Sequence, residues 1–194
     1  MLGVDKNLSV VKTEEINDSK FVEFKANSFS IILSKVKSFS GKSASLFVST
    51  NKNNKTEFEI FTQDGFIISE NSHSEVDLPL FFYDNQDGGI KSVFSINDEY
   101  FALVSLKKLT CFYASLINLK NRKELIKSNC LPDPKGADFS GLGGAYAKTD
   151  EGFLLTVGTP EHHAPEIAEL AQMDNSIFGK ILFIKNDSLA NYNN

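Results

Sequence analysis

Short hydrophobic runs and polar breaks follow one another along most of this chain. Several runs alternate apolar and polar side chains, as residues 57–61 do with Glu57, Phe58, Glu59, Ile60 and Phe61. A period of two places successive side chains on opposite faces of a β-strand. No stretch carries the 3.6-residue periodicity of a helical bundle. The pattern therefore predicts an all-β chain.

Turn signals divide these runs into hairpins. Asp64-Gly65 separates residues 57–61 from residues 66–69, and Asp-Gly between two apolar runs is typical of a tight hairpin turn. The next region is more regular, with strands expected over residues 90–96, 100–106, 110–117 and 124–128. Turns are expected between them over residues 97–99, 107–108 and 118–123. Four strands joined by short turns match the size of one propeller blade.

A second blade-like group of strands follows a connector rich in Pro, Gly and Asp. We expect a strand of small residues over 142–147, a turn over 150–152, and strands over 153–157 and 179–184. A long loop over 158–176 carries a helical turn within 165–173. Small residues suit a strand near a crowded propeller axis. The fold class predicted is a partial β-propeller of about two to three four-stranded antiparallel blades.

The pattern also predicts how the chain is divided. Residues 1–19 are expected to be a loose N-terminal lead-in. Residues 20–87 are expected to form a β-rich segment, either a divergent first blade or an appended β module, and residues 88–194 propeller blades. A chain of 194 residues is too short for a whole propeller, so a fragment is expected, with the remaining blades missing.

Composition narrows the function classes. With 41% hydrophobic and 23% charged residues, the chain has the make-up of a folded globular protein. A net charge of −5 without a basic cluster argues against a nucleic-acid partner. Arg122 is the only arginine, which disfavours bidentate capture of phosphate or carboxylate groups. No apolar run is long enough to span a bilayer, and the N-terminus does not have the pattern of a signal peptide.

The two cysteines, Cys111 and Cys130, do not form a metal-binding pattern. We interpret them as two buried thiols in β structure in preference to a disulfide. Their oxidation state leaves the compartment open.

Three segments in order resemble the glucose/sorbosone dehydrogenase family. They are Gly88-Gly89-Ile90, residues 143–158 with an acidic-glycine turn and a "TxG" strand, and residues 171–184 with an "AQ…NS" loop and a "GK-hydrophobic" strand. The likeness covers about half of the chain and not the first 85 residues. It implies a fragment of a six-bladed propeller, a sugar or aldose substrate, and pyrroloquinoline quinone (PQQ) with calcium as cofactors. It also implies a periplasmic or secreted location.

The resemblance further implies a catalytic His with an acidic partner. The corresponding positions fall near Ser140 and at Thr159, and neither side chain can act as that base and its orienting carboxylate. No catalytic residue is therefore identified. The loop after Gly158, with Glu161, His162 and His163, is the candidate substrate loop. A solvent-exposed loop without a site is the competing interpretation.

Three functional hypotheses follow. The chain is part of a PQQ-dependent sugar dehydrogenase whose remaining residues lie elsewhere, or a catalytically lapsed propeller that binds a carbohydrate or a protein. The third hypothesis is a self-sufficient small β protein whose likeness to propeller blades is incidental.

Overall fold

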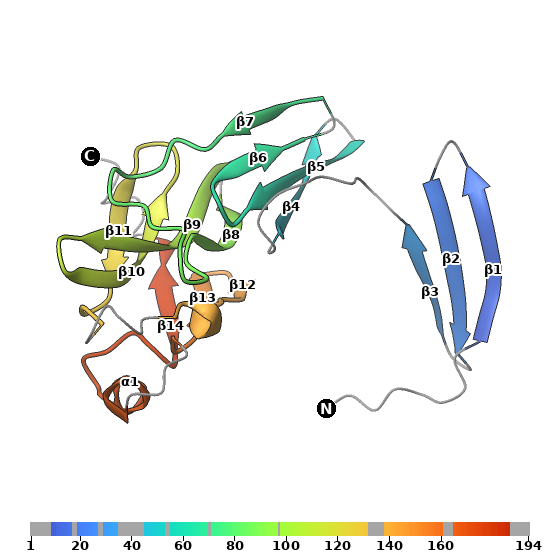
Figure 1. The fold of residues 1–194 in the computed structure, drawn as a ribbon. Coiled ribbons are helices and arrows are strands. Elements are labelled where there is room, and N and C mark those ends of the chain that lie inside the picture. The colour runs from blue at the N-terminus through green and yellow to red at the C-terminus, as the bar shows by residue number, and fades with distance from the viewer. Residues whose placement is uncertain are drawn as a thin grey trace. The chain divides into compact units, whose positions relative to one another are not determined.

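The structure is a computed structural model of the chain. It describes residues 9–16, 19–26, 29–34, 45–52, 55–69, 71–96, 98–131, 138–160 and 165–186. The chain divides into two compact units, Met1–Ser40 and Gly41–Asn194. Apart from two short helices, the regular elements of the described residues are β-strands, so the all-β prediction is confirmed (Figure 1).

The first unit contains one antiparallel sheet. Its strands are β1 (Ser9–Ile16), β2 (Ser19–Ala26) and β3 (Phe29–Ser34), in the order β1-β2-β3. The lead-in expected over residues 1–19 therefore contains a paired strand, because β1 runs in register with β2 from Ser9 opposite Lys25 to Ile16 opposite Ser19. Backbone pairing of this kind leaves little trace in hydrophobic pattern when the strand is polar.

The second unit opens with a four-stranded antiparallel sheet. Its strands are β4 (Ser45–Lys52), β5 (Lys55–Thr62), β6 (Phe66–Ile68) and β7 (His73–Glu75), paired in chain order. The hairpin predicted at Asp64-Gly65 is confirmed as the β5–β6 turn. Gly65 has φ +93°, a left-handed conformation that glycine adopts without steric cost.

The next sheet is a second four-stranded meander. It contains β8 (Ile90–Ile96), β9 (Glu99–Lys108), β10 (Cys111–Asn118) and β11 (Lys123–Lys127), in the order β11-β10-β9-β8. All four predicted strands are present. The turn expected at Lys107-Lys108 was misplaced, since both lysines pair with the start of β10 and the reversal follows at Leu109 and Thr110.

The last sheet has three strands, β12 (Tyr146–Lys148), β13 (Gly152–Val157) and β14 (Lys180–Lys185). A 3₁₀ helix over Ser140–Leu142 precedes it, and helix α1 (Pro165–Leu170) lies within the predicted helical turn. The small-residue strand expected over 142–147 is wrong at its start, because Leu142 ends the 3₁₀ helix. β12 is an exposed edge strand, which does not support the expected place at a crowded axis.

The β8–β11 sheet is covered on both faces. Its side chains alternate between two hydrophobic clusters, as Val93 and Phe94 do. One cluster joins it to β13 and β14, where the Phe94 and Phe153 ring centroids lie 5.0 Å apart. The other joins it to β5 and β6 through Phe61 and Ile67. Burial of apolar surface on both faces makes this sheet the centre of the second unit.

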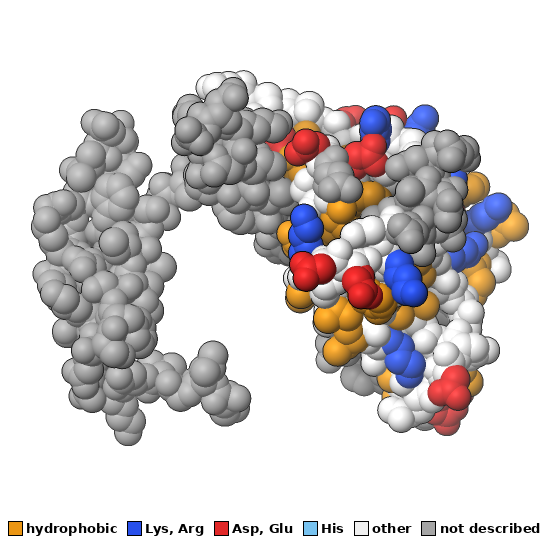
Figure 2. All heavy atoms as spheres, turned by 180° about the vertical axis from the view of Figure 1, so that it is seen from behind, with side chains coloured by type: hydrophobic (Ala, Val, Ile, Leu, Met, Phe, Trp, Pro, Cys, Tyr) orange, Lys and Arg blue, Asp and Glu red, His pale blue; other side chains and the backbone are white. Residues whose placement is uncertain are grey.

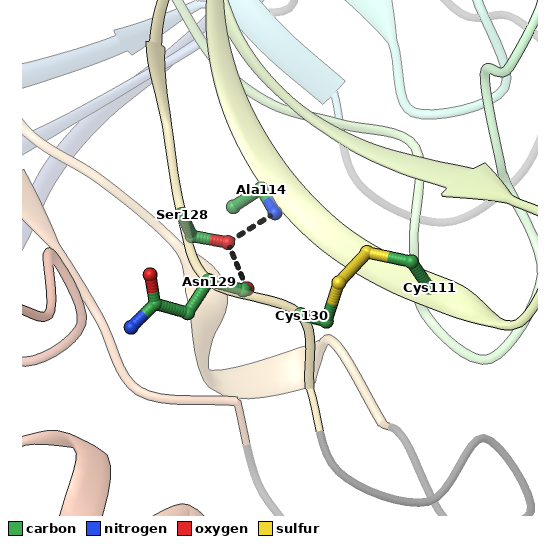
Figure 3. Close-up of a disulfide and its surroundings, with 5 residues drawn as sticks. All are labelled: Cys111, Ala114, Ser128, Asn129 and Cys130. Atoms are coloured by element: carbon green, nitrogen blue, oxygen red, sulfur yellow. Dashed lines mark hydrogen bonds between the residues drawn. A yellow bond between two sulfur atoms is a disulfide. The ribbon is translucent and has the colours of Figure 1, made fainter.

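A disulfide joins Cys111 to Cys130, which corrects the expectation of two buried thiols (Figure 3). Leu131 pairs with Phe112 in an isolated antiparallel bridge, so the preceding Cys130 reaches the start of β10. The Cα–Cα distance of 5.1 Å suits a disulfide. A bridge between residues 19 apart in sequence could not be read from their spacing, because it depends on how the chain returns after β11.

Candidate binding face at one end of the sheets

Connecting loops from all three sheets of the second unit meet through backbone hydrogen bonds. Ile90 N donates to Gln63 O at 2.9 Å, which links β8 to the β5–β6 turn. Phe139 N donates to Gln86 O at 3.0 Å, and Gly158 N donates to Gly143 O at 3.1 Å. The loops over residues 63–65, 83–89, 138–145 and 158–160 therefore form one continuous surface, which we call the loop face.

The loop over residues 83–89 is fixed by two buried polar side chains. Gln63 Nε2 donates to Gly88 O at 2.5 Å, and Gly89 N donates to Ser105 Oγ at 2.6 Å. The Ser105 hydroxyl donates in turn to Tyr83 O. Gln63 and Ser105 are 4% and 0% exposed, so both need partners, and the loop backbone supplies them. Gly88-Gly89, one of the three family-like segments, is thus held by the core beneath it.

Lys91, the second residue of β8, places a positive charge against the loop over residues 83–89. Its ammonium donates to Asp87 O at 2.7 Å. Partial burial lowers the pKa of Lys91 from its usual value, while the charges of Asp87 and Asp138 oppose that shift. Asp138 Oδ1 also accepts a hydrogen bond from Ser140 N at 2.8 Å. The face therefore combines a cation with carboxylates.

The structure brings together the two positions that the family resemblance singled out. Ser140 begins the 3₁₀ helix and Thr159 follows β13. Between them, the Cα of Gly158 lies so close to Gly141 O that a Cβ at residue 158 would overlap that oxygen. The backbone segments that carry Ser140 and Thr159 are therefore neighbours. Neither hydroxyl titrates near neutral pH, so this pair supplies no general base.

Tyr146 gives the same region an exposed aromatic ring. It is 45% exposed and stacks on the buried Phe94 ring at a centroid distance of 4.7 Å. Ala145 N donates to Thr156 Oγ1 at 2.7 Å, which holds the approach to β12 against β13. A ring backed by a core phenylalanine is a rigid platform with one open side.

The predicted substrate-loop residues Glu161, His162 and His163 lie outside the described residues, so their role stays a prediction. The described parts on either side of them are anchored. Ile167 and Leu170 of α1 are 1% and 7% exposed, and Phe178 is fully buried before β14 begins.

Sequence reasoning missed the polar residues that shape this face, namely Gln63, Lys91, Ser105 and Asp138. Ser105 carried one usable signal, a hydroxyl within the otherwise apolar run over residues 101–106. Gln63 and Asp138 carried none, since polar residues are expected in turns and connectors.

The residues described at the loop face do not fit a quinone that bears several carboxylates. Such a group needs several free cations and oxygen ligands for calcium. Lys91 and Lys180 border these loops, and both ammonium groups already donate to backbone carbonyls, of Asp87 and Ala171. Within the described part of the chain, no three His, Cys, Asp or Glu side chains gather as a metal site.

The fold and this face define an all-β protein of stacked antiparallel sheets with a polar loop surface at one end. Comparison with family models, curated proteins and solved structures finds no match for the chain. The likeness to glucose/sorbosone dehydrogenases therefore stays a prediction. Among the residues that the structure describes, no helix is long and apolar enough to cross a membrane.

Proposed function

We propose that the chain is part of a β-propeller-like protein that binds carbohydrate through the loop face and does not oxidise it. The scaffold part of the proposal is supported by the β8–β11 sheet, which packs between two other antiparallel sheets. Blades of a propeller pack face to face in the same way.

One observation carries the binding function over the enzymatic one. The segments that would hold a dehydrogenase base and its acidic partner lie side by side, yet they carry Ser140 and Thr159. Removal of a hydroxyl proton during hydride transfer needs a group that titrates near the working pH. Hydroxyl groups are suited instead to hydrogen bonds with a neutral ligand.

Carbohydrate is the ligand class that suits the chemistry of the face. Sugars present hydroxyl groups on their edges and C–H groups on their faces. Thr159 offers a hydroxyl, the Asp87 and Asp138 carboxylates offer acceptors, and the Tyr146 ring, backed by Phe94, offers a stacking surface. Glu161, His162 and His163 stay the substrate-loop candidates that the sequence predicts.

Isothermal titration with a panel of mono- and oligosaccharides tests the binding proposal. We expect at least one sugar to bind, and Tyr146→Ala to weaken that binding by roughly tenfold, the loss of one aromatic stacking contact of about 1 kcal/mol or more. Phe183→Ala is the matched control, because Phe183 is 46% exposed and pairs with Leu154, in the half of β13 farther from the loop face. Equal affinity in wild type and Tyr146→Ala would contradict the site.

The dehydrogenase hypothesis is tested on the same protein. PQQ and calcium are added, and reduction of an electron-accepting dye by aldoses is followed. We expect no turnover. Quinone-dependent turnover would replace the binding proposal with the enzymatic one that the family-like segments imply.

A further inference from the structure

Two leucines are held almost fully in water at neighbouring points of the second unit. Leu80 is 92% exposed and Leu109 is 87% exposed, while Phe81 is 37% exposed. Single exposed hydrophobic residues are ordinary on protein surfaces, but a group of them marks an interaction site. Figure 2 shows hydrophobic side chains open on the surface beside lysine or arginine in the described part of the chain.

Backbone pairing brings these residues together. Phe82 forms an antiparallel bridge with Leu106, and Lys107 N donates to Phe81 O at 2.8 Å. The turn that carries Leu80 and Phe81 therefore lies beside the end of β9, where Lys108 is followed by Leu109. We call the group Leu80, Phe81, Lys108 and Leu109 the leucine tip.

The tip stands on a rigid base. Phe82 N donates to Pro79 O at 2.9 Å and closes a turn around Leu80. Cys111, two residues after Leu109, is bound to Cys130 by the disulfide. The leucines are therefore presented by ordered backbone on both sides, which lowers the entropy lost on docking.

Leu109 is in a conformation that its side chain disfavours. Its φ is +56°, in the left-handed region, a conformation that Gly, Asn and Asp adopt most easily. A leucine at this turn therefore has both a backbone conformation and a degree of solvent exposure that are unfavourable for its side chain. Residues placed against both local preferences point to a role outside the fold.

Two lysines end β9 next to Leu109, and the ammonium group of each lies over an aromatic ring. Lys108 Nζ is 5.3 Å from the centre of the Phe81 ring, and Lys107 Nζ is 4.8 Å from that of Phe112. Exposed aliphatic side chains next to cations match the interface of a bilayer, where acyl chains lie beneath phosphate groups. Each lysine near an anionic leaflet adds attraction.

The acidic net charge of the chain does not prevent this contact. Charges separated by more than about 8 Å are screened at physiological salt, so the charged groups at the tip dominate its electrostatic interaction with a lipid surface. Among the acids that precede the tip, Asp77 is paired with Arg122 at 3.3 Å. Asp84 lies on the other side of the tip in sequence and adjoins Tyr83.

We propose that the leucine tip docks the protein on an anionic lipid surface. Leu80 and Leu109 enter the outer acyl region, and Lys107 and Lys108 contact lipid phosphates. The attachment is peripheral and reversible, because two leucines bury much less apolar surface than a spanning segment.

Co-sedimentation of the full chain with vesicles tests the proposal. Vesicles of phosphatidylcholine are compared with vesicles that also contain phosphatidylserine. We expect binding to the anionic vesicles, with weaker binding at high salt. Leu80→Ser should lower the partition coefficient by roughly tenfold or more, the effect of removing one buried leucine. Lys108→Gln should lower binding to the anionic vesicles and reduce its salt dependence.

A second variant separates docking from folding. Asparagine accepts the left-handed conformation of residue 109, so Leu109→Asn should lower vesicle binding while its midpoint of thermal unfolding stays the same or rises. Ile181→Ser, which changes another exposed hydrophobic residue on a different sheet, should bind as wild type does.

Two results would overturn the proposal. One is an absence of vesicle binding, or binding that Leu80→Ser leaves unchanged. The other is self-association that depends on Leu80 in a protein that does not bind vesicles, which would assign the tip to a protein contact.

Discussion

Gly158 lies against Gly141 so closely that a Cβ at residue 158 would overlap the Gly141 carbonyl oxygen. This contact joins the end of β13 to the 3₁₀ helix that precedes β12. It places the segments of Ser140 and Thr159 side by side at the loop face. The candidate site therefore depends on a backbone contact that only the absence of a side chain permits.

Gly158→Ala should destabilise the protein by about 1–3 kcal/mol, because the backbone must shift to accommodate the methyl group. Gly143→Ala is the matched control, since a Cβ there meets nothing within 4 Å. Urea denaturation measures both free energies of unfolding. Equal stability of the two variants would contradict the close approach at residue 158.

Loss of the disulfide should lower the free energy of unfolding by about 3 kcal/mol, the value expected from loop entropy for this separation. The comparison is between wild type and the double variant Cys111→Ser with Cys130→Ser. Dithiothreitol should reduce the stability of wild type to that of the variant and leave the variant unchanged. Two reactive thiols in the unfolded, unreduced wild type would show that the bridge is not formed.

Phe153→Ala should cost about 3–5 kcal/mol, the usual range for removing a fully buried phenylalanine. The ring packs on Phe94 and joins β13 to the β8–β11 sheet, so its removal leaves a cavity between the two sheets. Leu154→Ala, the next residue in the same strand, changes a side chain that is 38% exposed and should cost much less. Thermal or urea unfolding compares the two.

Glu99 gives the stability a small dependence on acidity. Hydrogen bonds from Lys120 and then from Asn118 hold the pKa of Glu99 below its usual 4.5 in the folded state. The unfolded state therefore binds the proton more readily than the folded state. The contribution of ionised Glu99 to the free energy of unfolding is complete above pH 4.5 and is lost as the pH falls through the folded pKa.

Glu99→Gln should therefore lower stability by about 0.5–1 kcal/mol at neutral pH, a range kept low because the Lys120 side chain is 74% exposed. The difference from wild type should shrink in acid. Urea unfolding at several pH values measures it, and Glu151→Gln in an exposed turn is the control. A difference from wild type that stays constant with pH would contradict the assignment.

The hydrophobic pattern was a good guide to the strands of the second unit. The runs over residues 90–96 and 101–106 alternate between the two faces of a sheet that is buried on both sides, so a period of two and a high apolar content coincide. The pattern was a poor guide to β1, whose polar residues are held by pairing with β2, and to the strand expected at Leu142.

By itself, the sequence determined the all-β character, the hairpin at Asp64-Gly65 and the four strands from Ile90 to Lys127, because alternation and turn residues are local properties. Tertiary structure decided the Cys111–Cys130 disulfide, the contact of Gly158 with Gly141, and the pairing that sets the turn of Leu80 and Phe81 beside the end of β9. Each of these joins segments whose distance in space depends on how the chain returns across its sheets. No local pattern encodes that distance.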